Sequence, residues 1–316
     1  MPDALSDSPR STVIVVTWRG REHITACLDA LAAQGRAHRT IVVDNASTDG
    51  TAELIAAHPS APRVLRLPRN AGYAGGLAAA LPLVDTPFVG WLNDDAAPEP
   101  DWLAALEDAV DGSATVAAAT SSMLLGDGST QSVGVRLTGD GHGADLTLAG
   151  RDVFGFCGGA ALLRTDALAR VGGVPADFFC YYEDTDTAWR LRLAGWRVVS
   201  VGPARVRHRH GASTEPGSAR FHRWNERNRL LTLARCAPAG VALRQAAAFA
   251  AITAALPLRR LRGVAVPDAA NFRLRLRLLV LAELLLRLPG CLAARRRIGR
   301  SATVPRAAVW REWAGR

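Results

Sequence analysis

The sequence predicts an α/β protein built on a sheet with several parallel strands. Short β-branched runs alternate with segments of helical spacing through the first hundred residues, which is typical of consecutive strand–helix–strand units. Crossovers in such units are right-handed and bring the carboxyl ends of the strands to one edge, where ligands of open sheets bind. With 316 residues, the chain has room for one large domain and a substantial appendage.

The elements of the first half follow in a regular order. Four apolar runs, at residues 13–16, 41–43, 64–67 and 87–92, are predicted as buried strands. Helices are predicted between them: at residues 24–31, through Leu54 and Ile55, and after the turn that ends at Gly76. Residues 102–110 are expected to form the next helix.

The second half is less regular. Residues 121–152 are Gly-rich and polar and are expected to form loops and hairpins, with ordered structure returning at 155–163. A helix is predicted over residues 184–194, ending before Gly195, and short strands at 196–201 and 204–206. From about residue 219 the chain is predicted to be helical nearly to its end, and it is rich in arginine.

Composition restricts the partners and the compartment. The net charge is +9, and all 38 basic residues are arginine, which suits anionic partners such as nucleotide diphosphates, anionic membrane surfaces or nucleic acid. The five cysteines are scattered without a Cys-x-x-Cys pair, which argues against a disulfide framework or a zinc site and favours a reducing cytoplasm. No run approaches about 20 uninterrupted apolar residues, so we expect no membrane-spanning helix.

Two adjacent carboxylates, Asp94 and Asp95, directly follow a predicted strand. Mg²⁺ and Mn²⁺ prefer oxygen ligands, and Mg²⁺ usually shares its shell with phosphates and water. The pair is therefore a candidate cation site, with solvated turn residues as the alternative. His208 follows a later strand and is a candidate ligand to the same cation, although His210 and His222 leave this assignment open.

Three features at the predicted strand ends suit a nucleotide. Asp44 ends the second strand, where it is able to accept a hydrogen bond from a base or ribose, or to cap the next helix. Trp18 offers an aromatic face for stacking, or packs in the core. The turn at residues 70–76 is Gly-rich and opens a helix, and such turns let the backbone approach a phosphate.

A second group of carboxylates, Glu183, Asp184 and Asp186, follows an aromatic run at the start of a predicted helix. The helix N-terminus favours their ionised form, whereas mutual repulsion and apolar surroundings raise their pKa values. One of them is therefore a candidate general base, and helix capping is the alternative. Because neighbouring residues on a helix diverge by about 100°, only one of the three is expected to point at a substrate.

Together these segments resemble family 2 glycosyltransferases with a GT-A fold, of the bacterial rhamnosyltransferase-like branch. The resemblance rests on segments that occur in the family's order: Val13-Ile14-Val15-Val16-Thr17-Trp18, Val43-Asp44-Asn45-Ala46-Ser47-Thr48-Asp49-Gly50-Thr51, Asn70-Ala71-Gly72-Tyr73-Ala74-Gly75-Gly76, Leu92-Asn93-Asp94-Asp95, Glu183-Asp184-Thr185-Asp186 and Ala204-Arg205-Val206-Arg207-His208. Each motif is modest, but the ordered set is specific and covers residues 12–236.

The resemblance implies a GT-A domain at residues 12–236, with a nucleotide-binding half (12–112), an acceptor half (113–236) and a mixed sheet flanked by helices. A polar tail (1–11) would precede it and a basic helical extension (237–316) would follow. The implied site residues are Thr17, Trp18, Asp44, Asn70, Gly75 and Asp94 for the donor, Asp95 and His208 for Mg²⁺ or Mn²⁺, and Asp184 as the base. With Asp184 as the base, Asp186 is expected to point elsewhere and to cap the helix or pair with an arginine. Two departures from the family pattern are Trp18-Arg19 in place of the common Tyr-Asn, and Asn93-Asp94-Asp95 in place of a strict Asp-x-Asp.

These roles imply an inverting, metal-dependent glycosyltransferase. It would move a sugar, with rhamnose as one candidate, from a nucleotide-diphosphate donor to a saccharide, lipid-linked or small-molecule acceptor. One alternative is a catalytically weak or inactive relative that binds membranes or polymers. Another is a sugar-1-phosphate nucleotidyltransferase, which needs a Gly-rich loop with a catalytic basic residue where this chain has Thr17, Trp18 and Arg19. We expect no nucleic-acid partner.

The C-terminal segment at residues 272–288 has the pattern of an amphipathic helix. Leucines 274, 278, 281, 285 and 288 share one face, arginines 273, 277 and 287 lie near each other on another, and three arginines follow at 295–297. Such a helix suits an anionic membrane interface, or packs on the catalytic domain. We therefore expect a cytoplasmic protein that associates peripherally with the inner face of the plasma membrane.

Overall fold

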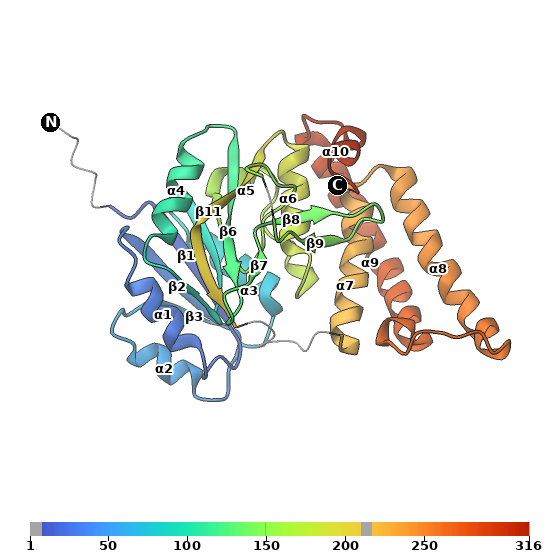
Figure 1. The fold of residues 1–316 in the computed structure, drawn as a ribbon, viewed down its shortest axis with the longest axis horizontal. Helices are drawn as coiled ribbons and strands as arrows, with labels where there is room; N and C mark the ends of the chain where they lie inside the picture. The colour runs from blue at the N-terminus through green and yellow to red at the C-terminus, as the bar shows by residue number, and fades with distance from the viewer. Residues whose placement is uncertain (1–7, 149, 210–216, 316) are drawn as a thin grey trace.

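Four parallel strands form the N-terminal half of the sheet, as their β-branched sequences predict. In the computed structural model, which describes residues 8–148, 150–209 and 217–315, their order is β3 (Arg63–Arg66), β2 (His38–Asp44), β1 (Ser11–Thr17) and β4 (Phe88–Asn93) (Figure 1). Thr17 is opposite Asp44, and Val16 is opposite Asn93. Three strands therefore end together at one edge of the sheet.

Two groups of helices cover the two faces of the sheet. One face carries α1 (Ile24–Ala32), α2 (Thr51–Ala57) and α4 (Trp102–Asp111), which bury Ile24, Ile55 and Trp102 in a common cluster. The other carries α3 (Gly72–Ala80), α5 (Thr165–Arg170) and α6 (Glu183–Leu193), with the short 3₁₀ helices η1 (Leu81–Leu83) and η2 (Ala176–Phe178). All seven residues of β1 are buried as a result.

The strands of the second half make the sheet mixed, as the family resemblance implies. β10 (Ala160–Arg164) runs antiparallel between β4 and β6 (Val116–Leu124), and β11 (Arg197–His208) runs parallel to β6. β5 (Ala96–Pro98) pairs antiparallel with β11, and β7 (Thr130–Ser132) pairs with β6. β8 (Val135–Leu137) and β9 (Gly143–Asp145) form a separate hairpin.

The structure corrects two of the predictions for this half. Residues 121–124, expected in a loop, belong to β6, whose nine residues are all buried. Small and polar side chains such as Ala119, Thr120 and Ser121 conceal this strand from a search for apolar runs. Residues 197–208, expected as two short strands, form one strand whose pairing is irregular between Val201 and Arg205.

The C-terminal region is helical, as predicted. It consists of α7 (Ala219–Cys236), α8 (Ala239–Leu261), η3 (Ala270–Phe272), α9 (Leu274–Ser301) and α10 (Arg306–Trp313). Leu276, Val280 and Leu284 of α9 belong to the same apolar cluster as the sheet, whereas α8 lies farthest from the sheet (Figure 1). The extension is therefore packed on the rest of the protein through α7 and α9.

The predicted apolar face of α9 is partly open to solvent. Leu278, Leu285 and Leu288 are exposed, while leucines 274 and 281 are half-buried. The prediction of a basic flank that includes Arg277 is wrong, because Arg277 is buried between α9 and α8. The packing of α9 on the sheet uses a different face, that of Leu276, Val280 and Leu284.

We expected no helix with the length and composition of a membrane span, but α8 has both. By length and composition alone it is apolar enough to cross a membrane, with a mean hydropathy of 1.5 over its best window, of which 22% is buried. Arg244 and Gln245 interrupt its apolar sequence, so a search for uninterrupted apolar residues passes over it.

Candidate active site

The carboxyl ends of β1 and β2 bring the predicted nucleotide-binding side chains to one edge. The Thr17 hydroxyl donates to Asp94 Oδ2 at 2.6 Å, which ties the end of β1 to the segment that follows β4. Asp44 is fully buried, and its Oδ1 accepts the backbone N–H of Ser47 at 2.9 Å. Its Oδ2 has no hydrogen bond among the described residues and lies 3.5 Å from Arg66 Nε. A buried carboxylate oxygen in this state suits a donor group of a ligand.

Two other residues that are predicted to bind the nucleotide-sugar lie at the rim of this edge. Trp18 is 37% exposed, and the Arg19 guanidinium stands 5.1 Å from its ring centre. Trp18 is therefore not a core residue, and its ring is open to stacking on a base. Gly75 is half-buried in the first turn of α3.

Asn45, to which sequence analysis gave no role, organises the turn at residues 70–76. Its Nδ2 donates to Gly72 O at 3.0 Å, and its Oδ1 accepts the N–H of Ala71 at 3.1 Å. Asn70 Oδ1 accepts the N–H of Gly72 at 2.8 Å. Gly72 has φ of +74°, and a Cβ there would lie 2.1 Å from Phe179 O. Only glycine fits this position. The close approach brings the Gly-rich turn at residues 70–76 against the loop that precedes α6.

Asp95 and His208 lie side by side because β5 pairs with β11, with Ala96 opposite His208. Asp95 Oδ1 is 3.1 Å from His208 Nε2. His208 Nδ1 is 2.7 Å from Gln131 Oε1, and Asn93 Nδ2 is 3.3 Å from His208 Nε2. Both contacts fit a ring with its proton on Nδ1 and a lone pair on Nε2, the form in which histidine binds a metal.

Asp94 has other partners than this pair. Its Oδ2 lies 3.4 Å from Nε2 of His23, in the turn before α1, and this hydrogen bond raises the pKa of His23. Sequence analysis did not select His23, because its position next to Asp94 depends on how α1 follows β1. Of the two histidines that left the assignment of His208 open, His222 lies on α7 against the ring of Phe221, and His210 falls outside the described residues.

The chemistry of Asp95 and His208 fits a divalent cation. A lone pair and a carboxylate oxygen at 3.1 Å repel each other unless a proton or a cation lies nearby. Within the described ranges, no three His, Cys, Asp or Glu side chains form a group that could hold a metal ion by themselves. Two protein ligands are sufficient for Mg²⁺ when phosphates and water supply the others.

A cavity of about 500 Å³ opens beside this pair. His23, Asp95 and His208 line it together with Arg207 and Arg209. The two arginines place positive charge around the pair of candidate metal ligands. Glu22 lines the cavity as well, and Arg207 Nη2 lies 3.8 Å from Glu99 Oε1. The lining therefore carries charges of both signs, which suits a cation bound together with an anionic ligand.

Asp184, the second residue of α6, is linked to the end of β4 by two glycines. Its Oδ2 accepts the N–H of Gly158 at 3.0 Å, and the carbonyl of Gly159 accepts the N–H of Asn93 at 2.9 Å. Burial raises the pKa of Asp184, and hydrogen bonds from the backbone N–H groups of Gly158 and Thr185 offset part of this rise. A half-buried carboxylate with a raised pKa is suited to accept a proton.

The two carboxylates next to Asp184 have different surroundings. Glu183 is buried, its Oε2 has no hydrogen-bond partner among the described residues, and burial raises its pKa to about 8. Asp186 is fully buried and pairs with Arg190 at 2.6 Å and Arg235 at 3.2 Å. The expected pairing of Asp186 with arginine is confirmed, and Asp184 is the carboxylate of the three that keeps partial exposure.

A strained loop leads into α6. Three of its residues have positive φ: Phe179 (68°), Tyr181 (69°) and Tyr182 (70°). Asn228, a buried residue of α7, holds the loop, since its Nδ2 lies 3.0, 2.9 and 2.8 Å from the carbonyl oxygens of Phe178, Cys180 and Tyr181. Sequence analysis missed Asn228, because nothing in a polar helix distinguishes it until the loop is known to lie against it.

Comparisons with known proteins agree with these features. The model of a family described as "Glycosyl transferase family 2" matches residues 12–172. The N-acetylglucosaminyl-diphospho-decaprenol L-rhamnosyltransferase of Mycobacterium tuberculosis is 30% identical in an alignment of 244 residues. The match covers 65% of this chain and 78% of that protein. The succinoglycan biosynthesis protein ExoO of Rhizobium meliloti is 32% identical over 105 residues, 32% of this chain and 30% of that protein.

Solved structures resemble this fold at lower identity. The mannosyltransferase PcManGT from Pyrobaculum calidifontis, in complex with GDP-Man and Mn²⁺, has a TM-score of 0.52 and 22% identity, covering 96% of this chain and 79% of that one. GalNAc-T7 with UDP, GalNAc and Mn²⁺ has a TM-score of 0.59 and 12% identity; 72% of this chain matches 48% of that longer chain. At these identities the likeness is one of fold.

Proposed function

Because the chain belongs to glycosyl transferase family 2 and is a glycosyltransferase, we propose that it transfers L-rhamnose from a nucleotide diphosphate to a lipid-linked saccharide. The observation that carries the proposal is the link from Asp184 through Gly158 and Gly159 to Asn93, at the start of the Asn93-Asp94-Asp95 segment. This link supports a base and a diphosphate site on the same edge. The choice of sugar and acceptor rests on the mycobacterial relative, which is an L-rhamnosyltransferase named for a diphospho-decaprenol substrate.

The donor would be bound at the ends of β1, β2 and β4. Trp18 would stack on the base, and the unsatisfied Oδ2 of Asp44 would accept a hydrogen bond from the base or ribose. Asn70 and Gly75 belong to the turn that lets the backbone approach the sugar or its phosphates, and Asp94 borders Thr17 at the same edge. These contacts hold the donor while one face of its anomeric carbon stays open to the acceptor.

Asp95 and His208 would hold Mg²⁺ or Mn²⁺ together with the diphosphate. A bound divalent cation would supply charge neutralisation to the departing diphosphate. Arg207 and Arg209, which line the same cavity, add positive charge at this point. Gln131 would keep the His208 ring in the tautomer that leaves Nε2 available.

Asp184 would act as the general base. It takes the proton from the acceptor hydroxyl as that oxygen forms a bond to the anomeric carbon. The bond between the anomeric carbon and the diphosphate oxygen breaks on the opposite face, so the anomeric configuration inverts. The partial exposure of Asp184, in contrast to buried Glu183 and Asp186, favours it for contact with an acceptor.

The test is a screen of nucleotide-sugars with the purified protein. We expect turnover of deoxythymidine-diphosphate-rhamnose with a polyprenyl-diphospho-N-acetylglucosamine acceptor. The product should carry the anomeric configuration opposite to that of the donor, because the proposed reaction is a single displacement. Turnover of a uridine-diphosphate sugar alone would overturn the assignment of the donor but would not contradict the proposed mechanism. Absence of turnover with every donor and metal tested would favour an inactive relative.

A further inference from the structure

The net positive charge of this protein comes from its C-terminal quarter. Residues 239–316 contain fifteen arginines and three carboxylates, whereas the preceding 238 residues contain 23 arginines and 26 carboxylates. The catalytic part is thus slightly acidic, although its substrates are anionic. The net charge of the extension therefore calls for a separate explanation.

Exposed apolar side chains gather in the same region. Of the fifteen large apolar side chains that are exposed among the described residues, eleven lie between Leu243 and Leu292. At the end of α8 they alternate with arginine in residues 258–264, here named the α8 tip. Its Leu258, Leu261 and Val264 are 49%, 86% and 50% exposed, and arginines 259, 260 and 262 are exposed between them.

We propose that the α8 tip docks on the surface of an anionic phospholipid bilayer. Leucine and valine side chains would enter the boundary between headgroups and acyl chains, while the arginines contact the phosphates. This inference rests on the proposed function, because it explains how the candidate active site would reach a lipid-linked acceptor in a membrane. Leu278 and Leu279, exposed near the start of α9, extend the apolar surface.

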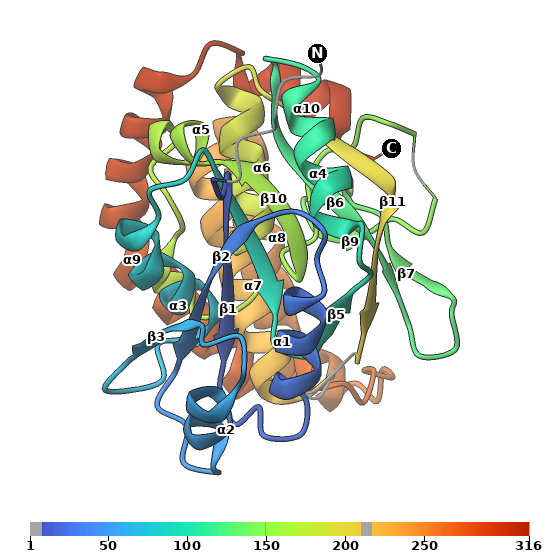
Figure 2. The same ribbon diagram turned by 90° about the vertical axis from the view of Figure 1, so that its left-hand side faces the viewer.

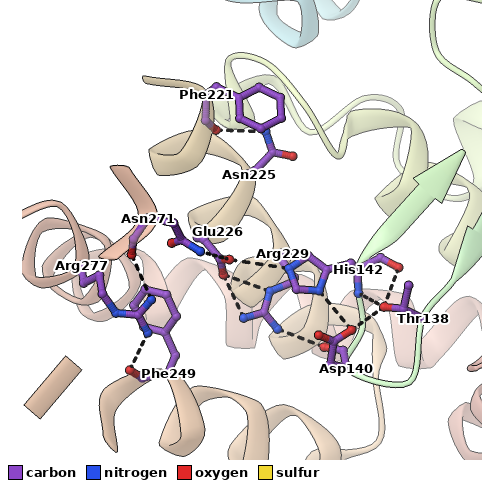
Figure 3. A network of polar contacts seen from close by, with 10 residues as sticks. All are labelled: Thr138, Asp140, His142, Phe221, Asn225, Glu226, Arg229, Phe249, Asn271 and Arg277. Carbon is purple, nitrogen blue, oxygen red and sulfur yellow. Dashed lines mark hydrogen bonds and ion pairs between the residues drawn. The ribbon is translucent and has the colours of Figure 1, made fainter. Parts of the chain in front are cut away.

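α8 docks on the bilayer rather than crossing it, because the helix is fixed in the protein by buried polar contacts. The Arg277 guanidinium of α9 donates to Phe249 O at 3.0 Å and lies 3.8 Å from the Phe249 ring centre (Figure 3). It also donates to Thr253 Oγ1 at 2.9 Å and to Asn271 O at 3.2 Å. Inserting α8 across a membrane would leave this buried guanidinium without its partners.

The α8 tip and the site lie on the same side of the molecule. In Figures 1 and 2 the chain descends along β1 toward the carboxyl edge of the sheet, and the turn after α8 also lies at the lower side of both views. The N-terminal end of α7 is at this side as well. A bilayer that contacts the tip would therefore lie on the side of the molecule at which β1 ends.

A second copy of this chain suits the surface less well than an anionic bilayer. Two such extensions would each bring an excess of twelve positive charges to the contact, and like charges oppose association. An anionic bilayer neutralises them instead. Each arginine near such a surface contributes about a fivefold gain in partitioning.

Vesicle flotation with the full-length protein tests the proposal. We expect the protein to float with vesicles of phosphatidylglycerol and phosphatidylcholine at 50 mM NaCl, to stay unbound with pure phosphatidylcholine, and to be released at 500 mM NaCl. Equal flotation with both compositions would overturn the proposal, as would no flotation at low salt. Resistance to alkaline carbonate extraction would show a spanning helix and would overturn it too.

Two variants locate the contact. Leu258→Ser with Leu261→Ser and Val264→Ser should lower the partition coefficient at least about tenfold. Arg259→Gln with Arg262→Gln should lower it about 25-fold. The control variants Leu148→Ser and Arg136→Gln are also at exposed positions but outside the extension, and they should bind as the wild type does. Equal losses in the control variants, or a wild-type dimer that the tip variants dissociate, would overturn the proposal.

A further measurement separates this inference from the proposed function. With a short-chain, water-soluble acceptor, the tip variants should keep wild-type kcat, while with a long-chain acceptor in anionic vesicles their rate should fall in parallel with binding. A wild-type protein that floats as expected but turns over no nucleotide-sugar would refute the proposed function and leave the docking surface in place. Normal rates of the tip variants on the vesicle-embedded acceptor would refute the docking role.

Discussion

At the scale of single residues, three acidic residues in the first turn of α6 have three different environments. Asp184 keeps partial exposure and accepts hydrogen bonds from the backbone, Glu183 is buried without a partner for Oε2, and Asp186 is paired with two arginines. The helical rotation between neighbours separates the three side chains, and the surroundings of α6 determine their protonation. The three carboxylates therefore give different expectations on substitution.

We expect Asp184→Asn to lower kcat by about 10²- to 10⁴-fold, the usual contribution of a general base. Donor affinity should be retained, because the donor contacts lie on other residues. Asp186→Asn should instead lower the melting temperature, since Arg190 and Arg235 would lose a buried partner. Steady-state kinetics and donor binding by calorimetry check this, and near-normal turnover of Asp184→Asn would remove it from the mechanism.

Glu183→Gln should change how stability depends on pH. Burial raises the pKa of Glu183 in the folded protein to about 8, above its ordinary value of 4.5. Between these values the folded state binds more protons than the unfolded state, so the wild type loses stability as pH rises from 4.5 to 8. We expect the variant to match the wild type at pH 4.5 and to melt at a higher temperature at pH 9. Equal differences in melting temperature at both pH values would contradict this.

Asp95→Ala should abolish the effect of metal on donor binding. In calorimetry, Mn²⁺ should tighten the binding of a nucleoside diphosphate to the wild type but not to this variant or to His208→Ala, because the pair at 3.1 Å would be lost. Gln131→Leu should weaken the effect of the metal by 10- to 100-fold, as expected when the partner of a metal-bound histidine is removed. Unchanged tightening by Mn²⁺ in all three variants would place the metal elsewhere.

At the scale of elements, the loop before α6 depends on α7. The backbone of residues 179–182 has a conformation that costs free energy at each residue with positive φ, and the Asn228 amide compensates by contacting three carbonyls. The loop also packs against Gly72, in the Gly-rich turn at residues 70–76. The segment proposed to bind the nucleotide-sugar therefore contacts the loop that precedes the candidate base. Asn228 is thus a positioning residue for the candidate base.

Asn228→Ala should lower kcat at least about tenfold with little change in donor KM. Asn228→Asp should be worse than alanine, because a carboxylate would face three carbonyl oxygens in a buried position. If Asn228 acts by positioning Asp184, adding Asn228→Ala to Asp184→Asn should cause no further loss of kcat. Multiplicative losses in the double variant would indicate a separate role.

The helices and strands that could be predicted from the sequence are those with a clear apolar pattern or a residue that ends the element. β1 and β2 follow from β-branched runs, β4 follows from an apolar run, and α6 follows from its stop at Gly195. β6 was missed because Ala119 and Ser121 give no apolar signal. The site followed the same rule. The places of Asp44 and Asp95 could be predicted because strand ends meet at one edge, whereas Thr17 came from the family resemblance. The family match confirmed the resemblance, and the roles of these residues stay predictions.

The residues that sequence analysis missed act across long separations. Asn45 reaches the Gly-rich turn at residues 70–76, Gln131 reaches His208, and Asn228 reaches the loop before α6, each through contacts that exist only after folding. No periodicity connects such pairs. The C-terminal helices were predicted, but which face of α9 would be buried was not, because leucines occur around its whole circumference.

At the scale of the whole molecule, the extension completes the core. Leu276, Val280 and Leu284 of α9 belong to the main apolar cluster, and Arg295 donates to the carbonyls of Ala234 and Ala237 at the end of α7. Figure 3 shows a second connection, in which Glu226 and Arg229 of α7 contact His142 and Asp140 of the β8–β9 hairpin. The helices therefore support the site as well as the surface proposed for lipid.

Removing residues 239–316 should destabilise the remaining protein strongly. Burying three aliphatic side chains contributes about 1.5–3 kcal/mol each, a large part of the roughly 5–15 kcal/mol that stabilises a typical domain. We expect the fragment 1–238 to be aggregated or to melt far below the full-length protein, measured by scanning calorimetry. A fragment with an unchanged melting temperature would show that the extension is an independent unit.

The position of β10 has a consequence for synthesis of the chain. β10 lies between β4 and β6, yet residues 94–159, including β6, precede it in the sequence. While the ribosome adds those residues, at roughly 5 to 20 per second, the free edge of β4 stays without its neighbour for several seconds. An unpaired strand edge is a template for association with other chains. Nascent chains that stop between residues 100 and 155 should therefore bind chaperones more strongly than chains that extend beyond β10.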